Sequence, residues 1–191
     1  MANNYSTGNV SPSLPLQAKH LAVLGIGDSL QGEPLPGICQ DDSGTWVVED
    51  ADLLFDFADE FIPEEVTPEE RLEIREVLLR MSQDTRGEIR TGLSAKEQNE
   101  KDSEGRTLYY LYAEDYGVDD SADTFLRWVL DSTPDLPWSS YEYADTCDKV
   151  RPGENGGGAW FLERGKPTEW VHTGRWLEER VAALAVGEGG A

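Results

Sequence analysis

Three side chains of this sequence could together carry out acyl transfer. Ser29 supplies a hydroxyl nucleophile, His172 an imidazole that could act as its general base, and Glu169 a carboxylate that could orient the imidazole. Acyl transfer to serine needs these groups within hydrogen-bonding reach of one another. Ser29, His172 and Glu169 are therefore the candidate catalytic residues of an ester hydrolase, if the fold brings them together.

The residues around Ser29 resemble a known motif. Gly27-Asp28-Ser29-Leu30 is similar to the nucleophile motif of the GDSL hydrolases, in which the serine closes the first strand. Glu169-Trp170-Val171-His172 is one substitution away from the Asp-x-x-His motif near the C-terminus of that family. The resemblance implies a serine ester hydrolase built on a doubly wound sheet.

The chain departs from that family in three respects. Gly32 follows the serine too closely, and the Gly-x-Asn-Asp block is missing, with Asn155 in "GENGGG" instead. The middle of the chain also lacks the strand–helix alternation of a doubly wound sheet. We therefore interpret "HLAVLGIGDSL" as a strand and a tight turn at Gly25, Gly27 and Asp28, and assign no catalytic residue.

No other motif predicts a metal or a cofactor. His20 and His172 are far apart in the sequence, there is no Cys-x-x-Cys, and the glycines near Ser29 complete no nucleotide-binding fingerprint. Cys39 and Cys147 are too few for a disulfide framework, which favours the cytoplasm and leaves open whether they pair. No apolar run is long enough to predict a membrane span.

Charge is the unusual feature of the composition. The 191 residues carry 38 acids and 16 bases, for a net charge of −22. Residues 41–70 hold twelve acids and no Lys or Arg, whereas residues 149–191 hold six of each sign. Such a surface repels nucleic acid and anionic membranes and attracts basic partners. A halophilic adaptation, in which the charge serves solubility alone, is the alternative.

The acids of the first half fall on predicted helix faces. Residues four apart on a helix lie about 6 Å apart along its axis, which is close to the separation of neighbouring phosphates on a DNA strand. Two such ribbons could therefore imitate nucleic acid. The predicted partner-binding residues are Asp52, Asp56, Asp59 and Glu60 on the first helix and Glu69, Glu73 and Glu76 on the second.

Periodicity and capping signals predict an α+β fold, with an antiparallel sheet, helices on one face and an acidic helical N-terminal region. Thr67-Pro68-Glu69-Glu70 is typical of a capping box that opens a helix, whose apolar face should bury Ile74, Val77, Leu78 and Met81. A short helix in 49–62 has the apolar residues Leu53, Leu54, Phe57, Ala58 and Phe61 at helical spacing, and a helix capped by Asp120 should bury Ala122, Phe125, Leu126, Val129 and Leu130. Strands are predicted at "TLYYLYAED", "WSSYEYADT", "AWFLER" and "TEWVHT", and a last helix at "GRWLEERVAALA". The predicted organisation is a disordered leader (1–18), an acidic, mostly helical region (19–83), a linker or mobile loop (84–106), an α+β domain (107–186) and a frayed tail (187–191).

The C-terminal fifth of the chain resembles the ends of uncharacterised small acidic proteins carried by phages and plasmids. The features that carry this resemblance are a Cys-x-Lys-x-Arg-Pro stretch, a glycine turn into a strand, and a final Thr-x-x-Trp-Leu helix. Here they are Cys147, Lys149, Arg151, Pro152, Gly156 to Gly158, Thr173, Trp176 and Leu177. The resemblance implies an origin in a mobile element and no particular activity.

Together these features predict a binding protein in preference to an enzyme. We expect an accessory protein of a mobile element that mimics nucleic acid and occupies the basic, nucleic-acid-binding surface of a host defence protein or nuclease. Such a protein binds neither nucleic acid nor membrane directly. The two alternatives are the GDSL-like ester hydrolase and the halophile-type acidic protein.

Overall fold

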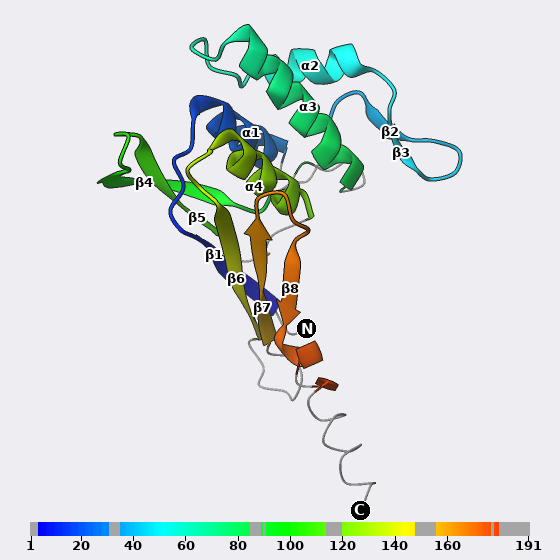
Figure 1. Cartoon of the computed structure of the whole chain (residues 1–191). Coiled ribbons are helices and arrows are strands. Elements are labelled where there is room, and N and C mark those ends of the chain that lie inside the picture. Colours follow the sequence, from blue (N-terminus) through cyan, green and yellow to red (C-terminus); the bar gives the residue numbers. More distant parts are fainter. Residues whose placement is uncertain are drawn as a thin grey trace, which may run out of the picture.

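The computed structural model shows an α+β fold (Figure 1), as the sequence predicts. It describes residues 4–30, 35–84, 89, 91–113, 120–147, 156–176 and 178–179. Within these residues, helices cover one face of a six-stranded antiparallel sheet, and no helix has the length and apolar character that crossing a membrane requires.

The sheet has the strand order β4-β5-β1-β6-β7-β8, so its first strand along the chain lies in its middle. A separate two-stranded hairpin, β2-β3, follows the first helix. The strands are β1 (Asn4–Ser11), β2 (Ile38–Gln40), β3 (Trp46–Val48), β4 (Ser94–Lys101), β5 (Thr107–Ala113), β6 (Trp138–Cys147), β7 (Gly156–Glu163) and β8 (Glu169–His172).

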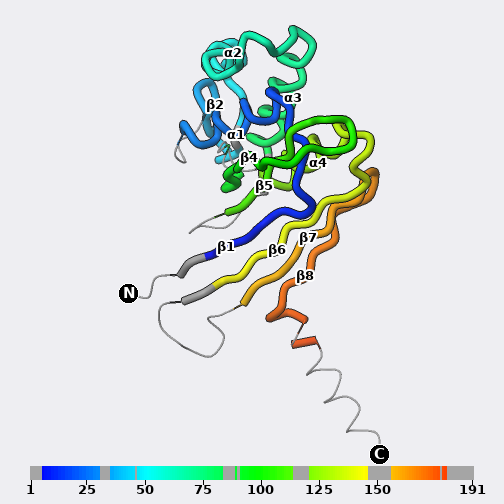
Figure 2. Tube along the Cα trace, turned by 90° about the vertical axis from the view of Figure 1, so that its left-hand side faces the viewer, coloured from blue at the N-terminus to red at the C-terminus, as the bar shows by residue number. Residues whose placement is uncertain are grey.

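Four helices lie at one end of the molecule, as Figures 1 and 2 show. They are α1 (Ala18–Leu30), α2 (Ala51–Asp59), α3 (Pro68–Asp84) and α4 (Asp120–Ser132). Helix α3 packs against α1 and α4, α4 contacts β6, and α1 contacts β4. Helix α2 lies on the outer side of the helical layer, away from the sheet (Figure 1).

The core forms between the helices and one face of the sheet. The predicted apolar face of α4 is fully confirmed, because Ala122, Phe125, Leu126, Val129 and Leu130 are all buried. Leu111, Tyr141 and Leu162 bury their side chains from the sheet side. Side chains alternate between the faces of a strand, so the residues directly before and after each of these three project from the opposite face of the sheet.

Residues 1–18 were expected to be a disordered leader, and this expectation was wrong for residues 4–11. They form β1, which pairs antiparallel with β5 on one side and along its whole length with β6 on the other. The polar sequence "NYSTGNVS" fits the strand because the described helices cover only one face of the sheet. Backbone hydrogen bonds to both neighbours hold it in place.

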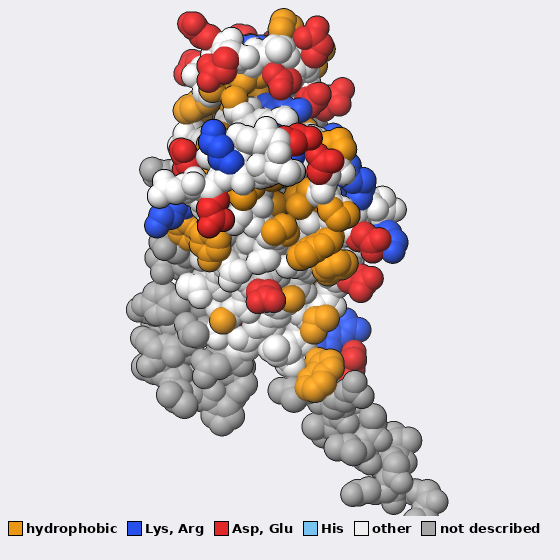
Figure 3. Space-filling view, turned by 60° about the vertical axis from the view of Figure 1, so that its left-hand side comes forward, with side chains coloured by type: hydrophobic (Ala, Val, Ile, Leu, Met, Phe, Trp, Pro, Cys, Tyr) orange, Lys and Arg blue, Asp and Glu red, His pale blue; other side chains and the backbone are white. Residues whose placement is uncertain are grey.

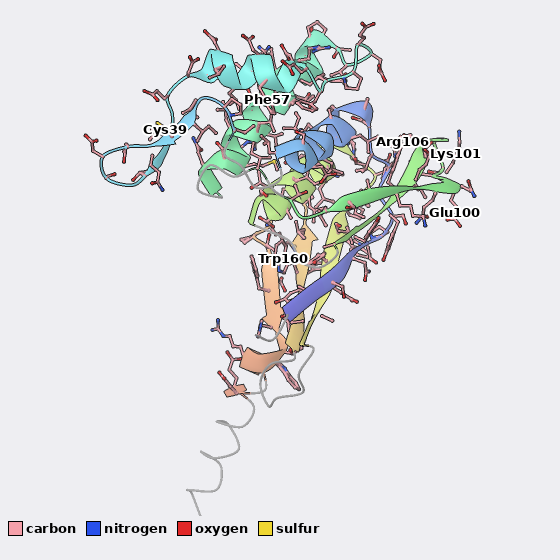
Figure 4. All side chains as sticks on the ribbon, turned by 180° about the vertical axis from the view of Figure 1, so that it is seen from behind. Cys39, Phe57, Glu100, Lys101, Arg106 and Trp160 are labelled. Atoms are coloured by element: carbon pink, nitrogen blue, oxygen red, sulfur yellow. The ribbon has the colours of Figure 1, made fainter. Side chains whose placement is uncertain are left out.

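The linker expected at 84–106 was also wrong in part, because it contains β4. The strand pairs antiparallel with β5 at the edge of the sheet and carries charged side chains, as edge strands often do. The turn that follows is built on Asp102, whose Oδ1 accepts hydrogen bonds from the backbone N–H groups of Glu104 and Arg106. Figure 4 shows Glu100, Lys101 and Arg106 at this tip.

The predicted boundary between a linker ending at residue 106 and an α+β domain beginning at residue 107 therefore does not divide the sheet. β1 and β4, which precede residue 107, pair within the same sheet as β5 to β8. The predicted strands around "TLYYLYA", "WSSYEYADT", "AWFLE" and "EWVH" are all present. The predicted last helix is helical at 173–176 and at 178–179, and the predicted tail lies outside the described residues.

The strand and turn expected at "HLAVLGIGDSL" are instead helix α1. Val23 and Ile26 are fully buried, and most other side chains of the segment are buried as well. Gly25 and Gly27 suggested a turn, but glycine lowers helix stability by only about 1 kcal/mol, which packing on this scale offsets.

The exposed Gly25 provides a test of this correction. A Cβ added there would meet nothing within 4 Å. We expect Gly25→Ala to raise the free energy of unfolding by about 1 kcal/mol, measured by urea denaturation, because alanine has the higher helix propensity. Gly27→Ala is the control, because its Cβ would lie 3.0 Å from the carbonyl oxygen of Ile89. The free energy of unfolding of this variant should rise less than that of Gly25→Ala, or fall. A lower free energy of unfolding for Gly25→Ala would contradict a helix at this position.

Candidate functional site

The acidic helices α2 and α3 begin with well-formed caps. At α2, the carboxylate of Asp50 accepts a hydrogen bond of 3.0 Å from the backbone N–H of Leu53. At α3, the N–H of Thr67 donates to Glu70 Oε2 (3.0 Å), and the N–H of Glu70 donates to Thr67 Oγ1 (3.2 Å). The predicted capping box is therefore confirmed, with Pro68 as the first residue of the helix.

The apolar faces of the two helices differ in how well the sequence predicted them. In α3, the expected residues Ile74, Val77, Leu78 and Met81 are all fully buried. In α2, Leu54 and Ala58 are buried, but Leu53 is 51% exposed. Helix α2 therefore contacts the core along a narrower face than its sequence pattern suggested.

Two of the seven predicted partner-binding acids form ion pairs within the fold. Asp59 lies 2.8 Å from the guanidinium of Arg75 and 3.5 Å from that of Arg71, which joins the end of α2 to α3. Glu73 accepts a hydrogen bond of 2.6 Å from Lys19 Nζ of α1, whose side chain is buried. Asp59 and Glu73 therefore have structural partners that their spacing in the sequence does not indicate.

The other five predicted acids are exposed. Asp52, Asp56 and Glu60 follow one another at intervals of four residues, so three carboxylates lie about 6 Å apart along the α2 axis. Glu69 and Glu76 are seven residues apart on α3, about 10.5 Å along its axis. None of the five forms an ion pair within the described part of the chain. We call these five residues the acidic surface.

Exposed apolar side chains lie beside the residues of the acidic surface. Leu53 follows Asp52 on α2, and Leu72 lies one helical turn from Glu69 and Glu76 on α3, where it is 59% exposed. Figure 3 shows acidic side chains gathered over α2 and α3 at the top of the molecule, with hydrophobic groups among them. The surface therefore offers both negative charge and small apolar contacts.

The candidate catalytic residues of the hydrolase alternative are not brought together. Ser29 lies in the last turn of α1, where its hydroxyl donates a hydrogen bond of 2.7 Å to the carbonyl of Ile26. Glu169 and His172 lie on β8, and all three side chains are exposed. Figures 1 and 2 place α1 and the C-terminal end of β8 in opposite parts of the molecule, so the structure contains no Ser29–His172 dyad.

The remaining sequence candidates concern the cysteines and the C-terminal stretch. Cys39 has a free thiol, and a hydrogen bond with Glu49 raises its pKa. Lys149 and Arg151 lie outside the described residues. Gly156, Gly157 and Gly158, expected in a turn, form the beginning of β7 instead, paired with β6.

The fold and the acidic surface define an α+β protein with a charged helical end and a sheet of which one face is not covered by any of the described helices. Comparison of the chain with protein-family models, curated proteins and solved structures found no match.

Proposed function

We propose that this protein binds a basic protein through the acidic surface and thereby blocks the surface with which that partner binds nucleic acid. The observation that supports the proposal is the row formed by Asp52, Asp56 and Glu60, whose carboxylates are exposed and have no ion-pair partner within the described residues. Their repeat is close to that of phosphates along a DNA strand, and their charge accelerates association with a basic partner.

The exposed leucines favour a surface that binds a protein over a surface whose charge only keeps the protein soluble. Solubility at high salt requires only hydrated carboxylates, whereas Leu53 and Leu72 leave apolar area among them. Protein interfaces combine apolar contacts with a charged rim in this way. The C-terminal resemblance to phage- and plasmid-borne proteins further favours a cytoplasmic host protein, such as a nuclease or a defence complex, as the partner.

A charge-neutralised variant tests the proposal. Asp52→Asn, Asp56→Asn, Glu69→Gln and Glu76→Gln are combined, while Asp59 and Glu73 are kept because they have internal partners. The wild-type protein is immobilised and exposed to cell lysate at low salt and at 0.5 M salt, where the Debye length is about 4 Å. We expect a basic nucleic-acid-binding protein to be held at low salt, released at high salt, and lost from the variant column.

The matched control removes four charges elsewhere. Glu97, Glu100, Asp131 and Glu169 are exposed and lie outside the acidic surface, so their neutralisation should leave capture intact. The captured protein is then purified, and its binding to a DNA or RNA duplex is followed with and without the wild-type chain. Equal capture by both variants, or a partner whose nucleic-acid binding is unaffected, would contradict the proposal.

A further inference from the structure

The uncovered face of the sheet carries a second candidate site, distinct from the acidic surface. One row of paired residues runs across all six strands: Ser94, Tyr112, Asn9, Glu142, Ala159 and Val171. Their neighbours Val10, Tyr141 and Trp160 are buried on the opposite face of the sheet. Because successive side chains point to opposite faces, this row projects from the uncovered face.

A hollow of about 690 Å³ lies on this face, over β1 between β5 and β6. Its floor is formed by Thr7 and Asn9, which are short side chains of the central strand. Tyr110 and Tyr112 of β5 stand on one side, with their ring centroids 5.8 Å apart and their planes 16° from parallel. Glu142 of β6 stands on the other side.

The size and the surroundings of the hollow fit a ligand. Its volume is within the range of about 300 to 1,000 Å³ that small-molecule sites occupy. Figure 3 shows the corresponding face, on which separate groups of hydrophobic side chains surround a polar area. Two further aromatic side chains, Trp138 and Phe161, lie stacked on the same face, with their centroids 5.8 Å apart.

The charges in the hollow disfavour a polyanion as its ligand. Lys96 of β4 is the only cation among its lining residues, and Glu142 balances it. The whole chain carries a net charge of −22, which repels phosphate groups at longer range. A nucleic acid, which would otherwise suit an aromatic sheet face, is therefore disfavoured, because such sites need a positively charged groove.

The lining instead offers both hydrogen-bond donors and hydrogen-bond acceptors beside aromatic rings. The amide of Asn9 both donates and accepts, Thr7 has a hydroxyl, Lys96 donates and Glu142 accepts. A sugar ring has a C–H face that packs on an aromatic ring and a rim of hydroxyls that donate and accept hydrogen bonds. We propose that this hollow binds a neutral oligosaccharide, with the ring of Tyr112 as the platform and Asn9 and Glu142 as hydroxyl partners.

The test is a titration of the full-length, isotope-labelled protein with cellohexaose, maltohexaose, xylohexaose and chitohexaose, followed by amide chemical shifts. We expect at least one of them to produce saturable shifts centred on Asn9, Tyr112 and Glu142, at concentrations up to about 5 mM, which covers weak single-site binding. Absence of a saturable shift with all four sugars would overturn the proposal.

Two variants and one control locate the bound sugar. Tyr112→Ala and Asn9→Ala should each weaken binding at least tenfold, while the dispersion of the amide spectrum reports that they remain folded. Phe61→Ala removes a partly exposed aromatic ring from the acidic end of the molecule and should leave affinity unchanged. Binding that survives both hollow variants would also overturn the proposal. Neither outcome depends on whether the acidic surface binds a basic protein.

Discussion

The wild-type protein is expected to lose stability on acidification below about pH 6.5, with His20 alone contributing about 1.4 kcal/mol per pH unit down to about pH 3. His20 is fully buried in α1, and its ring packs edge-on against Trp128 with the centroids 4.6 Å apart. Burial, aided by the neighbouring charge of Lys19, lowers the pKa of His20 from 6.5 to about 3.

The direction follows from where the proton binds. Below pH 6.5 the unfolded chain takes up a proton on His20, whereas the folded chain keeps the imidazole neutral until about pH 3. The contribution of His20 is therefore complete above pH 6.5 and is lost as the pH falls. The backbone N–H of Gln17 donates a hydrogen bond to Nδ1 of His20 (3.0 Å). Because Nδ1 accepts this bond, it carries no proton, as in a neutral imidazole.

The measurement compares the free energy of unfolding of the wild type and of His20→Asn at pH 7.5, 6.5, 5.5 and 4.5. Asparagine keeps an acceptor near the position of Nδ1 but cannot be protonated in this range. The difference between the two proteins should shrink by about 1.4 kcal/mol per unit below pH 6.5. His172→Asn is the matched control, because His172 is exposed. If the difference in free energy of unfolding between the wild type and His20→Asn stayed constant from pH 7.5 to 4.5, His20 would not be a buried neutral imidazole.

The sequence predicted the parts of the fold that have a strong local signal. Helix α3 combines a capping box with apolar residues at helical spacing, and α4 has an apolar face that is buried throughout. The strands β5 to β8 are rich in aromatic residues, which favour strands. In each of these elements, local preference and tertiary packing agree, so the pattern of side chains suffices.

The elements that were missed depend on partners that are distant in the sequence. Strand β1 pairs with β6 more than a hundred residues later, and the hydrogen bonds of that pairing leave no trace in the local sequence "NYSTGNVS". Helix α1 contains two glycines and lacks a hydrophobic periodicity, because it is buried on almost all sides. In the sequence alone, the continuous apolar pattern of such a buried helix cannot be told from that of a buried strand.

The same limit applies to the candidate site. Five of the seven predicted acids are exposed, whereas Asp59 and Glu73 have ion-pair partners that come from other elements. Arg71 and Arg75 are four residues apart on α3, which indicates a shared face but not what it meets. The hollow over β1 could not be anticipated, because β1 itself was not predicted.

Substitution of Gly8 is expected to have a large effect because β1 lies in the middle of the sheet. A Cβ added to Gly8 would lie 2.4 Å from the hydroxyl oxygen of Tyr141 and 2.5 Å from the backbone carbonyl oxygen of Glu142. The second contact is with backbone and cannot be relieved by a rotamer change. We expect Gly8→Ala to lower the free energy of unfolding by about 3 kcal/mol in urea denaturation, as overpacking of a core does.

A glycine at the beginning of β7, two strands away from β1 in the sheet, provides the control. At Gly156 the nearest atom to an added Cβ is the hydroxyl oxygen of Thr173, at 3.7 Å, which is an ordinary contact. Gly156→Ala should therefore change stability by no more than about 0.5 kcal/mol. The pair of variants separates the effect of the crowded position from the general effect of alanine in a strand.

A variant at Tyr141 shows how much of the stability loss of Gly8→Ala comes from the clash with the Tyr141 side chain. In a Tyr141→Leu background, the ring and hydroxyl no longer reach the added methyl group, while the contact with the carbonyl of Glu142 remains. Gly8→Ala should then cost about 1 to 2 kcal/mol less than in the wild type, a coupling expected of residues in direct contact. If residues 4–11 were instead a disordered leader, Gly8→Ala would leave stability unchanged in both backgrounds. The size of this coupling therefore tests whether β1 is the central strand on which both the core and the proposed sugar site depend.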